Sequence, residues 1–135
     1  MKLDTDKANE NRELLRRGYE AFGTGDLETV QALFKPDAVW HAQRLGLLSG
    51  DHEGWPQIAE FFGETMQMTQ GTFRLEIEDI LATEHRVAVT ARSKATRNGR
   101  TLDSYQVHLY RIDDGKVAEI WQFVDDHVNV TDFWS

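Results

Sequence analysis

Three side chains of the types that carry protons in cofactor-free catalysis are His41, His108 and Asp125. Histidine titrates near neutrality, so it can act as a general acid, a general base or a donor to a developing oxyanion. A carboxyl group in apolar surroundings has a raised pKa, which suits the same role. We therefore take these three as candidate catalytic residues. Each also has a structural alternative: a satisfied core histidine, an edge hydrogen bond, and a strand-end carboxylate in water, respectively.

Two of the three candidates belong to a predicted β-hairpin over residues 104–126. Alternating runs flank Asp114-Gly115, and both central residues of a type I′ turn need positive φ. A two-residue turn sets His108 opposite Trp121, whereas a three- or four-residue loop would shift the pairing. The strict register gives one face the make-up of a pocket wall: Gln106, His108, Tyr110, Glu119, Trp121, Phe123 and Asp125. The other face is plainly apolar: Tyr105, Val107, Leu109, Ala118, Ile120, Gln122 and Val124.

Large aromatic residues are candidates for holding the apolar part of a substrate. Tyrosine adds a hydroxyl group that can reach a ligand oxygen, while the alternative for all of these rings is core packing. The substrate-binding candidates are Tyr19, Trp40, Tyr110, Trp121 and Phe123. A metal site would need clustered ligands, and the histidines with acidic neighbours are His41, His52, His108 and His127. They show no His-x-His or His-x₃-His spacing, and cysteine is absent, so we predict neither a metal nor another cofactor.

The elements that must position these residues follow from periodicity. Apolar spacing predicts a helix over 9–22, a second helix capped by Asp26, and a third that opens at Trp55-Pro56. Strands are predicted over 38–42, 73–78, 86–96 and 101 onward, with a tight turn at Asn98-Gly99. Helices first and antiparallel strands last predict a single α+β domain over 1–135. We expect residues 43–54, rich in glycine with apolar residues between, to form a mobile flap over the pocket.

Bulk composition narrows the class of protein. The formal net charge of −8 and the pI near 5.0 argue against a nucleic-acid partner. No apolar stretch approaches the roughly 20 residues that span a bilayer. The first residues lack the apolar core of a signal peptide, so we expect a cytoplasmic protein without a membrane partner.

Three strings in this order resemble the nuclear transport factor 2-like superfamily, and within it the ketosteroid isomerase-related, SnoaL-like proteins: GDLETVQALFKPDAVWHA, LSGDHEGWPQIAEFF and VHLYRIDDGKVAEIWQF with DDHVNVTDFWS. The resemblance covers about residues 10–135. It implies a cone-shaped, curved, mixed or antiparallel sheet wrapped around three helices, a pocket for a small apolar molecule, and a homodimer. We expect the dimer to form on the outer sheet face through Val107, Leu109, Ile120 and Val124, since no remaining segment covers that face.

At the three catalytic positions of the steroid isomerases, this sequence has different residue types. Their aspartate base aligns with Ala42, their helix tyrosine with Gly18, and their oxyanion aspartate with His108. Tyr19 is one residue away from the tyrosine position, about 100° around a helix. Ketosteroid isomerase activity itself is therefore not expected.

The SnoaL-like cyclases use an acidic residue near the final strand, which corresponds to Asp125 or Asp126, and strand parity favours Asp125. Two functions stay open. One is cofactor-free acid/base chemistry, of the isomerase, cyclase, dehydratase or hydrolase type, on an apolar carbonyl- or hydroxyl-bearing substrate. The alternative is a non-catalytic ligand-binding protein of the same fold.

Overall fold

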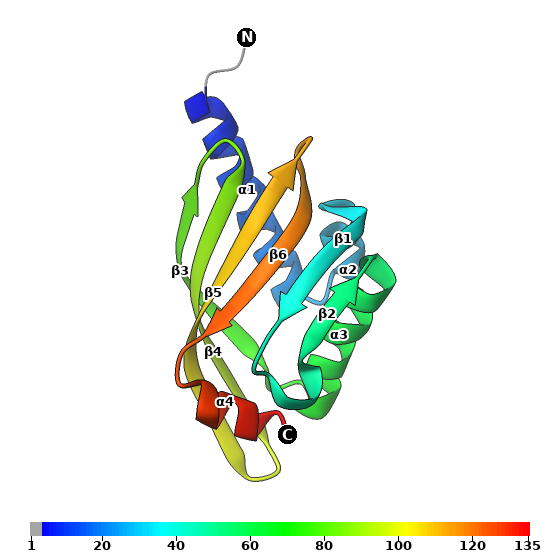
Figure 1. Cartoon of the computed structure of the whole chain (residues 1–135), viewed down its shortest axis with the longest axis vertical. Helices are drawn as coiled ribbons and strands as arrows, with labels where there is room; N and C mark the ends of the chain where they lie inside the picture. Colours follow the sequence, from blue (N-terminus) through cyan, green and yellow to red (C-terminus); the bar gives the residue numbers. More distant parts are fainter. Residues whose placement is uncertain (1–3) are drawn as a thin grey trace.

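The computed structural model describes residues 4–135, as four α-helices, one short 3₁₀ helix and six strands (Figure 1). All three predicted helices and the predicted strands are present, although most elements extend further than predicted. No helix within this range is long and apolar enough to cross a membrane. In chain order the elements are α1 Asp4–Gly23, α2 Leu27–Ala32, β1 Phe34–Ala42, η1 Gly46–Leu48, β2 Gly50–Glu53, α3 Trp55–Met68, β3 Arg74–Ala82, β4 Arg86–Arg97, β5 Arg100–Asp113, β6 Lys116–Val124 and α4 His127–Phe133.

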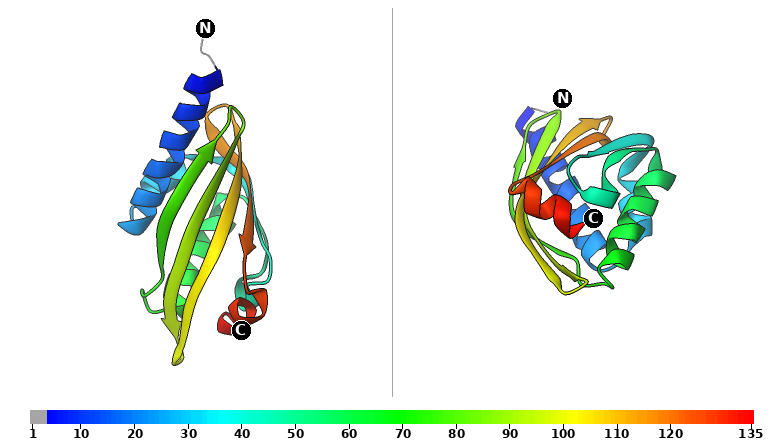
Figure 2. Two further views of the ribbon diagram at one scale, coloured as in Figure 1. Left: turned by 90° about the vertical axis from the view of Figure 1, so that its left-hand side faces the viewer. Right: turned by 60° about the horizontal axis from the view of Figure 1, so that its bottom comes forward.

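One mixed sheet organises the molecule, with strand order β2-β1-β6-β5-β4-β3. The β1–β6 pair is parallel and all other pairs are antiparallel. Helix α1 packs on β3 and β4, and α3 packs on β1 and β2. Figure 2 shows that the sheet curves around these helices, so its concave face is covered and its convex face is bare. The fold is therefore the predicted α+β cone.

Local chemistry explains the sharp turns between elements. Asp114 and Gly115 both have positive φ, at 50° and 73°, as a type I′ hairpin turn requires. Asn98-Gly99 makes the corresponding turn between β4 and β5. Asp26 caps α2 as predicted, because its side chain accepts a hydrogen bond from the backbone N–H of Thr29 at 3.1 Å.

A β-bulge in β6 changes which residues face inward. Ile112 pairs with Val117 but Arg111 pairs with Glu119, which leaves Ala118 as an extra residue. Beyond the bulge, His108 lies opposite Gln122, so the predicted pairing of His108 with Trp121 is wrong. The bulge keeps the charged Glu119 off the concave face, where strict alternation would have buried it among apolar side chains.

The segment 43–54, predicted as a loop, contains η1 and the edge strand β2, which pairs with β1. Its own Leu45 and Leu48 side chains are buried. The Leu47 N–H donates to the carbonyl oxygen of Trp134 at 2.9 Å, which ties this segment to the C-terminal α4 region. The C-terminal aromatics are buried and docked, as their size predicts. The mobility of the segment stays a prediction.

Candidate functional site

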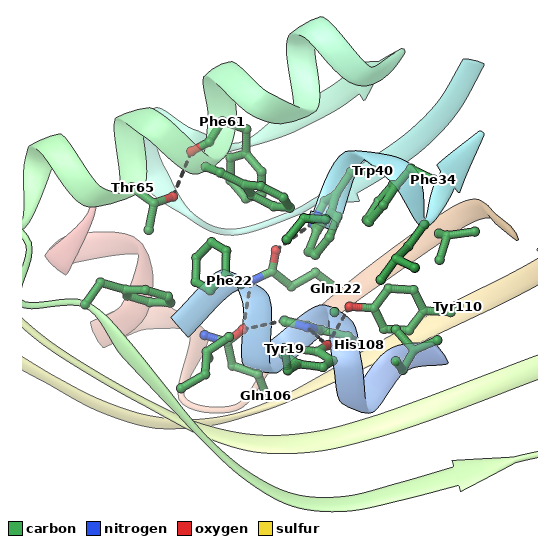
Figure 3. Close-up of a pocket in the computed structure, with 18 of the residues that line it drawn as sticks. Tyr19, Phe22, Phe34, Trp40, Phe61, Thr65, Gln106, His108, Tyr110 and Gln122 are labelled. Atoms are coloured by element: carbon green, nitrogen blue, oxygen red, sulfur yellow. Dashed lines mark hydrogen bonds between the residues drawn. The ribbon is translucent and has the colours of Figure 1, made fainter. Parts of the chain in front are cut away.

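A cavity lies between the concave face of the sheet and the helices (Figure 3). About 70 Å³ of it is open to the centres of water-sized molecules. One water needs roughly 10–15 Å³ by this measure, so the space fits a small organic molecule. Most of the lining is apolar, contributed by the helices α1, α2, η1 and α3 and by the strands β1, β3, β5 and β6. Phe62 of this lining packs its ring against those of Phe22 and Phe61, with ring centroids 5.3 Å and 5.8 Å away.

A small polar cluster is built into this apolar wall. Strand β5 supplies Gln106, His108 and Tyr110, because alternate residues of a strand face the same way. Helix α1 supplies Tyr19, and β6 supplies Gln122 from beyond the bulge. All five side chains line the cavity.

Hydrogen bonds connect the cluster on the side of His108. Tyr19 Oη lies 2.6 Å from His108 Nδ1 and 2.5 Å from Tyr110 Oη. His108 Nε2 lies 2.9 Å from Gln106 Oε1. Both ring nitrogens of His108 are therefore occupied by protein groups, and a ligand can exchange a proton with the imidazole only through one of these neighbours.

Two further bonds extend the cluster to β1. Gln122 Nε2 donates to Gln106 Oε1 at 2.8 Å. Trp40 Nε1 donates to Gln122 Oε1 at 2.9 Å, and the Trp40 indole stands edge-on to the His108 ring. Figure 3 shows these bonds as one connected chain.

Burial controls the protonation of the cluster. It lowers the pKa of His108 to about 4, because the cation would lose its hydration. Burial also raises the pKa of Tyr19 well above its ordinary value, with Tyr110 adding to the effect. The pKa of Tyr110 is raised by burial, against a smaller opposing effect of the bond from Tyr19. At neutral pH the cluster is uncharged.

The structure brings four of the predicted site residues together. His108, Tyr19, Tyr110 and Trp40 all line the cavity. The helix geometry turns Tyr19 inward although it is one residue away from the isomerase tyrosine position. Their roles in binding or catalysis stay predictions.

The other four predicted site residues lie outside the cavity. Trp121, Phe123 and Asp125 were expected on the pocket face, and this is wrong because the Ala118 bulge inverts the parity of β6. Asp125 is exposed, and its carboxylate accepts a hydrogen bond from the Tyr105 N–H at 3.1 Å.

His41 is also on the outer face, since Trp40 takes the inward position of β1. Its ring stacks on Trp121, and its two nitrogens lie 2.7 Å from Asp51 Oδ1 and 2.6 Å from Glu119 Oε2. Burial alone would lower the pKa of His41, but the bonds to Glu119 and Asp51 outweigh it and raise that pKa. His41 is thus held between two carboxylates on the outer face and does not reach the cavity.

Sequence reasoning missed Gln122 as a site residue, because the strict register put it on the far face. A signal was present: Val117-Ala118 are two adjacent small apolar residues next to the turn, which breaks the alternation. Among residues 4–135, no group of three histidine or acidic side chains is arranged to hold a metal ion.

A curved sheet closed by helices around an apolar cavity is the fold of the nuclear transport factor 2-like superfamily. The SnoaL-like domain family matches residues 15–120, and the chain belongs to this family.

Known proteins of similar sequence and structure span nearly the whole chain. An uncharacterised protein of Mycobacterium tuberculosis is 28% identical over 124 residues, which is 91% of this chain and 95% of the relative. The structure of Bal32a, from a soil-derived mobile gene cassette, is 32% identical with a TM-score of 0.92, and the match covers 96% of this chain and 99% of that one. TerC, co-crystallised with polyporic acid, is 25% identical with a TM-score of 0.80, covering 93% and 98%.

Proposed function

We propose that this protein binds a small, largely apolar molecule that carries a carbonyl or hydroxyl group, and transfers a proton on it without a cofactor. The observation that carries the proposal is the contact between Tyr19 Oη and His108 Nδ1, 2.6 Å apart at the polar end of an apolar cavity. An aromatic lining excludes water, which strengthens every hydrogen bond made there. The co-crystal of the structurally similar TerC with polyporic acid supports a small organic ligand in this fold.

The Tyr19–His108 pair provides a route for a proton. A proton that leaves the ligand is accepted at Tyr19 Oη, while the Tyr19 hydroxyl proton moves to His108 Nδ1. The ligand is left as an anion, which the Tyr110 hydroxyl can stabilise by turning toward it. Return of the proton by the same route to a different ligand atom completes an isomerisation. Alternatively, the anion attacks a carbonyl carbon within the ligand, and the alkoxide formed takes the proton back from Tyr19 Oη, which regains one from His108 Nδ1, to complete a cyclisation.

A second candidate function is binding without chemistry, and one specific observation favours it. No carboxylate lines the described cavity, so nothing there offsets the charge of a protonated His108. With the pKa of His108 at about 4, protonating it at pH 7 costs about 4 kcal/mol. A protein that only binds its ligand never needs to protonate His108, so this energetic cost does not arise.

Native mass spectrometry of the protein purified from its own host identifies a retained ligand and tests both candidates. With that ligand as substrate, His108→Ala should lower turnover by about two to four orders of magnitude if the protein is an enzyme. The matched control is His85→Ala, since the His85 side chain is 77% exposed. An unchanged ligand, with affinity only modestly reduced in His108→Ala, would establish the binder instead.

We also propose that the convex sheet face joins two copies of this chain. The apolar side chains there are Tyr105, Val107 and Phe123, which are 45%, 37% and 54% exposed, and the half-buried Leu109 and Trp121 between them. Ile120 and Val124, expected in this patch, face inward because of the bulge. Both arginines and carboxylates border the patch, so the face can meet a second copy of itself around a two-fold axis.

A further inference from the structure

The hydrogen-bond chain of the cavity can be assigned a single direction, starting from Trp40. An indole N–H can only donate, so the Gln122 atom that faces Trp40 Nε1 must be the carbonyl oxygen. The amide nitrogen of Gln122 then faces Gln106, 2.8 Å away, and must donate to Oε1 of that residue.

The same direction fixes the tautomer of His108. Gln106 Oε1 is an acceptor, so His108 Nε2, 2.9 Å away, must carry the hydrogen. A neutral imidazole has one N–H, so Nδ1 is the acceptor for the Tyr19 hydroxyl. The Tyr19 oxygen in turn accepts from the Tyr110 hydroxyl.

One strong donor of the chain is left over. Gln106 Nε2 takes part in none of these bonds, and Figure 3 shows it turned away from both His108 and Gln122. Within residues 4–135 no fully buried side-chain nitrogen or oxygen lacks a partner, so Gln106 Nε2 must border open space although Gln106 is only 4% exposed. Gln106 lines the cavity, and we infer that the space beside its Nε2 is part of that cavity.

We propose that the Gln106 amide N–H is the specificity-determining donor for a carbonyl oxygen of a neutral ligand, and that Trp40 is the positioning residue that keeps it pointing there. This rests on the proposed small-molecule function and names the substrate class. No lysine or arginine lines the described cavity, so a carboxylate ligand would find no counter-charge and is selected against. A ligand hydroxyl would instead donate to the free lone pairs of Tyr110.

The tautomer is tested first, by ¹⁵N-NMR of histidine-labelled protein at pH 7. The expected spectrum has His108 protonated at Nε2 only. Trp40→Phe removes the fixed donor and frees both glutamine amides to reverse, so a mixture of the two tautomers should appear. Trp55→Phe is the control, because Trp55 also packs against the core but takes part in none of these hydrogen bonds, and it should keep the single tautomer. His108 protonated at Nδ1 in the unmodified protein would overturn the assignment.

The donor is tested with two small probes, acetophenone and ethylbenzene, which differ in the carbonyl oxygen. The unmodified protein should bind acetophenone about tenfold more tightly, the fold-change expected for one buried hydrogen bond. Gln106→Met should abolish the preference. Equal affinities in the unmodified protein, or a preference that survives in Gln106→Met, would refute the proposal. These measurements need no turnover and no retained ligand, so they fail independently of the proposed function.

Discussion

Tyr19 Oη lies 2.6 Å from His108 Nδ1, and this contact joins α1 to β5 across 89 residues of sequence. Tyr19 Oη also contacts Tyr110 Oη on the same strand, so within the described cavity cluster this one hydroxyl group links the helical layer to the sheet. The position of α1 on the sheet and the protonation of the site therefore depend on the same hydroxyl group.

Tyr19→Phe should reduce the free energy of unfolding by about 1–3 kcal/mol, because His108 Nδ1 and the Tyr110 hydroxyl both lose their partner in a buried site. Urea denaturation measures this. Tyr105→Phe is the control, since that ring lies on the exposed outer face and its change should stay within about 0.5 kcal/mol. Equal effects of the two changes would contradict the role given to Tyr19.

Stability should fall as the pH is lowered from 6.5 toward 4. The unfolded chain then binds a proton at residue 108 that the folded protein, with a pKa of about 4 against an ordinary 6.5, does not. The contribution is about 3 kcal/mol over this window. The measurement is the free energy of unfolding at each pH for the unmodified protein and for His108→Gln, and the contribution of His108 is the difference between the two. Parallel curves would show that His108 is not held neutral.

His41 should act in the opposite sense. Its folded pKa is raised, so its stabilisation is complete below the unfolded pKa and is lost as the pH rises through the folded value. His41→Gln should therefore be less stable than the unmodified protein on the acid side, and this difference should shrink as the pH rises above 6.5. Thermal melts across pH 5 to 9 measure this.

Asp125→Asn should change acetophenone affinity by less than about twofold, because the exposed carboxylate contacts only the β5 backbone. Isothermal titration gives the comparison with the unmodified protein. A tenfold loss of affinity would show that Asp125 belongs to the binding site after all.

Phe123→Asp should convert the proposed dimer to a monomer at micromolar concentration, because it places a charge in the centre of the apolar patch. Val128→Asp is the matched control, since Val128 is 70% exposed on α4. Sedimentation velocity distinguishes the two species. A monomeric unmodified protein would contradict the proposal directly.

Local patterns were sufficient to predict β5. The Asp114-Gly115 turn and strict alternation place His108 and Tyr110 inward, as the structure has them. Which residues of β6 face inward was not predictable by the same rule, because a single extra residue at a bulge shifts the alternation, and Val117-Ala118 was the sequence signal for it. Strand β2 was missed because an exposed polar edge strand carries no apolar alternation.

The cavity cluster could be predicted only in part. Tyr19 and His108 were identifiable by residue type, but the bonds between them depend on how α1 lies across the sheet. The roles of Gln106 and Gln122 depend on a chain of contacts that spans three strands, and no local pattern encodes it.

Because Ala118 is an extra residue, the number of residues in β6 decides which of its side chains face the cavity. Deleting this single residue would restore strict alternation. Ile120 and Gln122 would then turn outward, and Glu119 and Trp121 would turn inward. A glutamine amide would leave the cavity and an indole would enter it, with no substitution anywhere. Two chains of this family that differ by one insertion here would carry interchanged ligand-facing and partner-facing surfaces, even where their sequences align identically on either side.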